Sequence, residues 1–95
     1  MESRLTVDSY GIKKWYNKNG KKHRDNGPAV IWPGGTKLWY RNGQLHREDG
    51  PALVRSDSTV EWFLNNKDYS FAEWADKLNL DQKTRLGMVL KWNPN

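Results

Sequence analysis

Two histidine–arginine pairs are the residues of this sequence whose types could support chemistry. His23-Arg24 recurs as His46-Arg47, at the matching place in the next copy of a repeated segment. A histidine can transfer protons or ligate a metal, and an arginine can bind phosphate. Because both pairs recur at the same place, a structural role is favoured. Each histidine is expected to hydrogen-bond beneath the Gly-Pro turn that follows it, and each arginine to stack on an aromatic ring of the repeat.

Few other residues could complete a catalytic or metal site. The chain has no cysteine and two histidines, so a metal site would need several carboxylates as well. No nucleophile elbow or phosphate-binding loop is present, and Glu48-Asp49 is interpreted as a pair of turn formers. We therefore expect no metal, no cofactor and no enzymatic activity.

An internal repeat organises the chain. One copy runs from Trp15 to Ala29, the next from Trp39 to Ala52, and a decayed third begins at Trp62. The first copy carries one extra residue before its Asn-Gly pair. Residues recurring at matched positions are assigned a structural role: Trp15, Tyr16, His23, Gly27 and Pro28, then Trp39, Tyr40, His46, Gly50 and Pro51, then Trp62.

Each copy has the local chemistry of a β-meander. Asn19-Gly20 and Asn42-Gly43 are predicted to form two-residue type I′ turns, which need positive φ at both central positions. Gly27-Pro28 and Gly50-Pro51 supply a second reversal, with proline at the start of a strand. The pattern predicts seven to nine short antiparallel strands in sequential order.

The C-terminal part of the sequence is helical in pattern. Ser70 and Glu73 form a capping box, and an apolar stripe follows at helical spacing: Phe71, Trp74, Ala75 and Leu78. A second helix is predicted from near Asp81 to about Lys91, burying Leu86, Val89 and Leu90. We expect the two helices to pack across the open end of the sheet and cap the last repeat.

These patterns define the expected fold class. It is mainly β with C-terminal helices: an antiparallel β-meander built from hairpin repeats of about 23 residues and capped by two short α-helices. One domain covers residues 1–95, with hairpins in 4–69 and the helical cap in 70–92. Six Trp, four Tyr and two Phe predict an aromatic core, because each ring buries roughly 150–250 Å².

The segment from Trp39 to Ala52 resembles a repeat of large bacteriophage and giant-virus proteins, W-Y-x-N-G-x-x-H-R-x-D-G-P-A, related to MORN repeats. The first copy is similar, except that Asn26 replaces the usual aspartate and one residue is inserted. Residues 70–80 also look like the terminal helix of those proteins. The resemblance covers about residues 5–92 and implies a viral accessory protein that acts inside a bacterial cell by binding.

The charge of the chain favours an acidic partner. Sixteen Lys and Arg against eleven Asp and Glu give a net charge of +5. Basic residues interleaved with aromatic rings suit single-stranded nucleic acid, whereas the alternative is a solvated face that protects edge strands. The candidate partner-binding residues of the repeats are Lys13, Lys14, Lys21, Lys22, Arg24, Arg41 and Arg47.

A second candidate surface lies on the last predicted helix. Arg85, Met88 and Trp92 are spaced to share one face, displaced from Leu86 and its partners. Exposed, such a stripe has the composition of a protein-interface hot spot. In the alternative arrangement, Trp92 folds over the sheet and closes the core.

The first functional hypothesis is a phage-type accessory protein that binds a host protein, such as a defence or gene-expression factor, and inhibits it. One alternative is an RNA- or DNA-binding protein that grips the phosphate backbone. A second alternative is a minor virion or assembly component. No segment approaches the roughly 18 apolar residues of a membrane span, so we expect a cytoplasmic protein of a bacterial host cell, with its oligomeric state left open.

Overall fold

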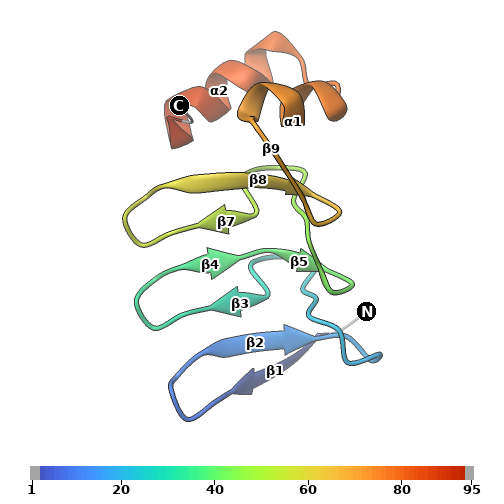
Figure 1. The fold of residues 1–95 in the computed structure, drawn as a ribbon, viewed down its shortest axis with the longest axis vertical. Coiled ribbons are helices and arrows are strands. Elements are labelled where there is room, and N and C mark those ends of the chain that lie inside the picture. Colours follow the sequence, from blue (N-terminus) through green and yellow to red (C-terminus); the bar gives the residue numbers. More distant parts are fainter. Residues whose placement is uncertain (1–2, 94–95) are drawn as a thin grey trace.

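The computed structural model describes residues 3–93, and its strands form an antiparallel meander (Figure 1). Seven strands make the main sheet in the order β1-β2-β3-β4-β7-β8-β9, and β5 pairs with β6 in a separate hairpin. The expected mainly β fold, an antiparallel meander with two C-terminal helices, is confirmed, but the strand order is not strictly sequential because β4 pairs with β7. The strands are β1 Arg4–Val7, β2 Lys13–Tyr16, β3 Val30–Ile31, β4 Lys37–Leu38, β5 Tyr40–Arg41, β6 Gln44–Leu45, β7 Leu53–Val54, β8 Val60–Leu64 and β9 Lys67–Tyr69.

Three five-residue loops, at the left in Figure 1, join β1 to β2, β3 to β4 and β7 to β8. Each closes with the same pair of backbone hydrogen bonds across its ends. Each also places one residue at positive φ: Gly11 at 83°, Gly35 at 107° and Ser58 at 73°. A residue in this conformation completes a type I turn with a bulge, which reverses the strand within a short loop. Serine is the odd member of the set, because this conformation favours glycine.

The turns on the other side of the sheet follow the prediction in one full copy and depart from it in the other. Asn42 and Gly43 have φ of 52° and 84°, as a type I′ turn requires. In the Asn19-Gly20 pair of the first copy, Gly20 alone has positive φ, and its N–H donates to the carbonyl of Asn17 (3.0 Å). The prediction of a two-residue turn at Asn19-Gly20 was wrong, because the inserted residue lengthens the loop by one position.

The turns also connect successive copies. The N–H of Gly43 donates to the carbonyl of Lys22 (2.8 Å), and the N–H of Asn66 donates to the carbonyl of Leu45 (2.8 Å). The two bonds occupy matching places in successive copies. Each turn is therefore anchored to the copy before it, so the hairpins stack at a fixed spacing.

The two helices begin where the sequence indicates. α1 spans Phe71–Lys77 and carries the predicted capping box at Ser70, in which the serine hydroxyl and Glu73 satisfy two backbone N–H groups. α2 spans Gln82–Trp92 and is capped by Asp81, whose side chain accepts a bond from the N–H of Thr84. No helix within residues 3–93 is both long and apolar enough to cross a bilayer.

The hydrophobic core cluster lies between the helices and the last hairpin, at the upper end of the stack in Figure 1. Trp62 and Trp74 are 4% and 0% exposed, and their ring centroids lie 4.5 Å apart. Phe71 and Leu78 of the predicted helical stripe pack against this pair. The aromatic core expected from the composition is thus concentrated under the helical cap.

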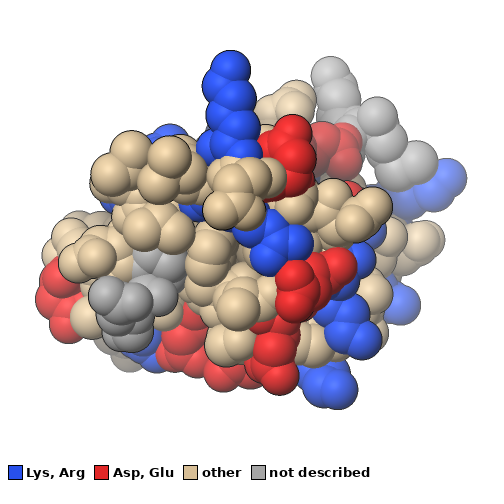
Figure 2. Space-filling model, turned by 90° about the horizontal axis from the view of Figure 1, so that it is seen from above, with Lys and Arg blue, Asp and Glu red and all other residues tan. Residues whose placement is uncertain are grey.

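The prediction for the buried face of α2 was wrong. Leu86, Val89 and Leu90 are 59%, 40% and 78% exposed, whereas Met88 and Trp92 pack against the core. The helix is rotated so that its one aromatic side chain, Trp92, packs on the core in place of the three aliphatic residues. Figure 2 views the molecule from the end where the helices lie. Uncharged side chains cover much of this end, with acidic and basic groups among them.

Candidate functional site

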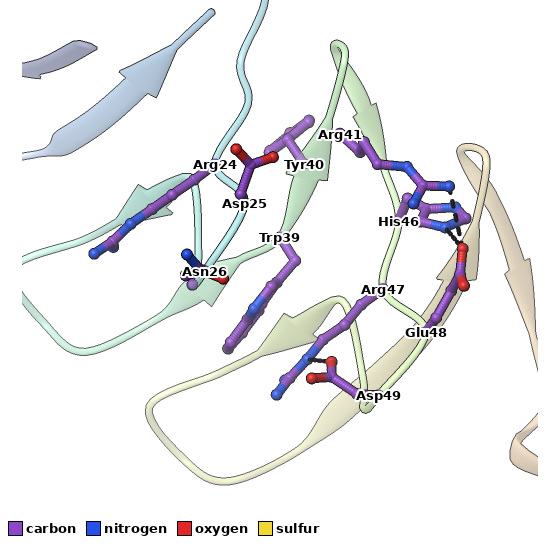
Figure 3. A pocket seen from close by; sticks show the side chains of 11 residues that line it. Arg24, Asp25, Asn26, Trp39, Tyr40, Arg41, His46, Arg47, Glu48 and Asp49 are labelled. Atoms are coloured by element: carbon purple, nitrogen blue, oxygen red, sulfur yellow. Dashed lines mark hydrogen bonds and ion pairs between the residues drawn. The ribbon is translucent and has the colours of Figure 1, made fainter. Parts of the chain in front are cut away.

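Two crossover segments run back to the main sheet: residues 23–28 lie between β2 and β3, and residues 46–51 lie between β6 and β7. We call them the first and second crossover loops. Between them lies a cavity of about 640 Å³, the crossover groove (Figure 3). The groove is lined by Arg24, Asp25, Asn26, Gly27, Trp39, Tyr40, Arg41, His46, Arg47, Glu48 and Asp49.

His46 is held at the edge of the groove by both ring nitrogens. The residue is 8% exposed, and the backbone N–H of Asn65 donates to its Nδ1 (3.0 Å). Because Nδ1 accepts this bond, the ring proton sits on Nε2, which donates to the carboxylate of Glu48 (2.6 Å). Neither nitrogen is left to bind a metal ion or to exchange a proton with a substrate.

His23 makes the equivalent contacts one copy earlier. Its Nδ1 accepts a bond from the N–H of Asn42 (3.0 Å), and its Nε2 donates to Asp25 (2.8 Å). Both histidines were expected to hydrogen-bond beneath the following Gly-Pro turn, and that partner was wrong. Each reaches the turn of the next copy instead and so joins the two copies.

Arg24 and Arg47 each stack on a tryptophan of the repeat, as the sequence predicts. Arg24 lies over the ring of Trp15 with its Cζ 3.9 Å from the centroid, and Arg47 lies over Trp39 at 3.8 Å. Stacking on a tryptophan holds a guanidinium in a defined plane and is favourable by about 0.5–2 kcal/mol. The expectation that the arginines stack on repeat aromatics is confirmed.

The same arginines hold the Gly-Pro segments. Nη1 of Arg24 donates to the carbonyl of Pro28 (3.2 Å), and Nη1 of Arg47 donates to the carbonyl of Pro51 (3.0 Å). Arg47 also donates to Asp49 (2.8 Å). The arginines therefore hold the Gly-Pro ends of the crossover loops, whereas the histidines bond to the carboxylates earlier in the same loops.

The charges around the groove are balanced. Three arginines face three carboxylates: Arg24, Arg41 and Arg47 with Asp25, Glu48 and Asp49. Arg41 donates to Glu48 (3.1 Å). The hydrogen bond from His46, followed by the charge of Arg41, lowers the pKa of Glu48, and burial raises the pKa of Tyr40. The groove thus offers ionised groups of both signs beside aromatic rings.

The lysines proposed as partner-binding residues are not gathered into one patch. Lys13 and Lys14 are neighbours on β2, so their side chains leave opposite faces of the sheet. Lys21 and Lys22 lie beyond the other end of that strand. Nζ of Lys22 sits 4.9 Å from the ring centroid of Tyr40, which places it beside the crossover groove.

The stripe predicted on the last helix is not an exposed surface. Nε of Arg85 donates to the carbonyl of Leu80, and its Nη1 donates to Asp76, each at 2.8 Å. Met88 and Trp92 pack on the core. The prediction of an exposed Arg-Met-Trp patch was wrong, and the alternative, in which Trp92 closes the core, describes the structure.

Sequence reasoning did not identify the contacts that join the copies. Asn42 was predicted only as a turn residue and Asn65 was given no role, yet their N–H groups hold the two histidines. The constant spacing between each histidine and the turn of the following copy was a signal that could have revealed them. Glu48 and Asp49 were interpreted as turn formers, although they line the groove.

Metal ligands do not gather in the part of the chain that is described: no three His, Asp or Glu side chains lie together there in a way that could hold an ion. Comparisons with protein-family models, curated proteins and solved structures found no match to this chain.

Proposed function

We propose that this protein is a non-enzymatic binding protein whose crossover groove receives part of a partner protein. The observation that carries the proposal is a groove of about 640 Å³ that is lined by aromatic and charged side chains, several of which are held by stacking or hydrogen bonds. Arg47 is clamped by Trp39 and Asp49, and Glu48 by His46 and Arg41. Side chains already held in place lose little entropy on binding, which favours affinity.

The mixture of charges supports a protein partner over a nucleic acid. Asp25, Glu48 and Asp49 all line the groove, and each would repel a phosphate backbone. Protein interfaces combine arginine and aromatic anchors with balanced polar rims, which is the composition found here. Among the lysines that would favour nucleic acid, Lys13 and Lys14 lie on opposite faces of β2, and Lys22 lies beside the groove.

The partner that we propose is a host protein that the groove occludes. The resemblance of Trp39 to Ala52 to a repeat of phage proteins supports a phage-type accessory role, acting in the cytoplasm of a bacterial host cell. Inhibition of a defence or gene-expression factor by steric blocking requires binding alone. It is consistent with histidines that have no ring nitrogen to spare.

The test is affinity capture from bacterial lysate, with and without nuclease, followed by mass spectrometry. We expect a saturable protein partner that survives nuclease treatment. Arg41→Glu, which reverses a charge inside the groove, should weaken its binding by about tenfold. Lys37→Glu makes the same change at an exposed position outside the groove lining and is the matched control, expected to bind like the wild type.

Three outcomes would contradict the proposal. One is capture of nucleic acid alone, with binding abolished by Lys21→Glu and Lys22→Glu. Another is a protein partner whose affinity falls equally in the two charge-reversed variants. The third is the absence of any saturable partner.

A further inference from the structure

Trp92 fills a space between two neighbouring copies of the repeat. Its ring centroid lies 5.6 Å from Cζ of Arg47 on one side and 5.9 Å from the ring of Trp62 on the other. The floor of this space is Gly50: a methyl group there would lie 2.9 Å from Cη2 of Trp92 and 2.8 Å from Cζ of Arg47. Glycine is required because the indole and the guanidinium both press against the backbone.

The three groups around Trp92 have counterparts one copy earlier. Arg24, Gly27 and Trp39 stand in the sequence where Arg47, Gly50 and Trp62 stand in the next copy. The two arginines sit in equivalent positions, since each stacks on its own tryptophan and donates to its own Gly-Pro carbonyl. The space bounded by Arg24, Gly27 and Trp39, here called the indole slot, is therefore built on the same plan.

No ring of residues 3–93 fills the indole slot. The three atoms nearest to a methyl group on Gly27 all belong to the guanidinium of Arg24, at 3.2–3.4 Å, and none belongs to an aromatic ring. Gly27 is half-exposed, whereas Gly50 is buried. Arg24, Gly27 and Trp39 all line the crossover groove, and Figure 3 shows Arg24 and Trp39 pointing to the same side of the ribbon.

We propose that the indole slot binds an aromatic side chain, preferentially tryptophan, of the partner protein. This inference rests on the proposed function, since it names the group that the groove receives. A guest indole would lie against the guanidinium of Arg24 and the ring of Trp39, as Trp92 lies against Arg47 and Trp62. Its N–H is a donor, and Asp25 and Glu48 on the groove wall are acceptors.

The probe is N-acetyl-L-tryptophanamide, titrated into the ¹⁵N-labelled full-length protein and followed by two-dimensional NMR. We expect saturable shifts at the Gly27 amide and the Trp39 indole N–H, with a dissociation constant of about 1 mM for a ligand of this size. N-acetyl-L-leucinamide should bind more weakly, because it has neither a ring to stack nor an N–H at the right place.

Gly27→Ala places a methyl group in the slot and should weaken binding about fivefold or more, since the guest loses its stacking on Arg24. Gly34→Ala is the matched control, because a methyl group there meets nothing within 4 Å and lies in a five-residue loop away from the groove. Arg24→Gln is a second test of the slot, should Gly27→Ala fail to fold. It removes the stacking cation and should weaken binding similarly.

Shifts scattered over the surface, or equal binding by the Gly27 and Gly34 variants, would overturn the inference. So would tighter binding of adenosine monophosphate, which would assign the slot to a nucleotide, or the same shifts produced by raising the protein concentration alone, which would assign it to a second copy. The two proposals fail separately. If a captured partner is sensitive to Arg41→Glu but the probe does not bind, the indole-slot proposal fails and the proposed function stands. If the probe binds but no partner is captured, the proposed function fails and the indole-slot proposal stands.

Discussion

His46 connects three parts of the molecule through one buried ring. It accepts a bond from the turn of the next copy at Asn65 and donates to Glu48 in its own crossover loop, beside the arginine that stacks on Trp39. A histidine used in this way fixes the spacing between copies. The structural role expected from its recurrence agrees with these contacts, but the choice of partner depends on how closely the copies stack, which spacing along the chain does not specify.

Glu48 makes part of the stability dependent on pH. Its pKa is lowered from 4.5 by the bond from His46 and the charge of Arg41, so its contribution is fully present above pH 4.5 and is lost as the pH falls through the lowered value. We expect Glu48→Gln to reduce the free energy of unfolding at pH 7 by less than about 1 kcal/mol, because the carboxylate is half-exposed. In urea titrations, the difference from wild type should shrink below pH 4.5. A difference that stays constant with pH would contradict this account.

The three five-residue loops adopt the same backbone conformation from different sequences. Gly11, Gly35 and Ser58 occupy the same position with positive φ, and in the third loop the sequence uses a residue for which this conformation is unfavourable. The Ser58 side chain is exposed. The loop conformation is therefore set by the strands it joins and the backbone bonds at its ends, not by glycine alone.

Ser58→Gly should stabilise the protein. Removing the side chain relieves the left-handed conformation at a net gain of about 0.5–1 kcal/mol in the free energy of unfolding, measured by denaturant titration. Gly35→Ser makes the opposite change in the equivalent loop and should lower the free energy of unfolding. The nearest atom to the new Cβ is 3.8 Å away, so the loss of stability should come from the backbone conformation and not from a clash. Equal effects of the same sign in the two variants would refute the comparison.

α2 packs on the core through Met88 and Trp92, which is not the face that the sequence pattern predicted. Trp92→Ala should lower the free energy of unfolding by about 3 kcal/mol, because the ring fills the space between Arg47 and Trp62. Leu90→Lys should change it by less than about 0.5 kcal/mol, since Leu90 is 78% exposed. Circular dichroism in urea measures both. The assignment of faces is wrong if Leu90→Lys is the more damaging change.

The elements were predictable from local chemistry, whereas their orientation was not. Asn42-Gly43 and the Ser70 capping box form the turn and the helix start that their local chemistry predicts, whereas one inserted residue changes the turn at Asn19-Gly20. In α2, two apolar stripes have compatible helical spacing. The choice between them depends on the bonds from Arg85 to Leu80 and Asp76 and on the space available to Trp92. The groove was not predictable either, because it arises only when two crossover loops stack.

At the scale of the whole molecule, the fold is an elongated stack with principal extents of 41 × 27 × 19 Å. The helices and the cluster around Trp62 and Trp74 close one end, and β1, exposed along its length, forms the other. Each copy contacts mainly its neighbours, so equivalent positions recur along the stack. Trp92 fills one such position, and the equivalent position one copy earlier, the indole slot, lies at the crossover groove.

Hydrogen exchange with the captured partner measures most directly whether the crossover groove is the binding surface. Peptides covering the two crossover loops, residues 23–28 and 46–51, should exchange more slowly in the complex than in the protein alone. The five-residue loops at 8–12, 32–36 and 55–59 should be unchanged. Protection of those loops or of α2, with the crossover loops unaffected, would contradict the account.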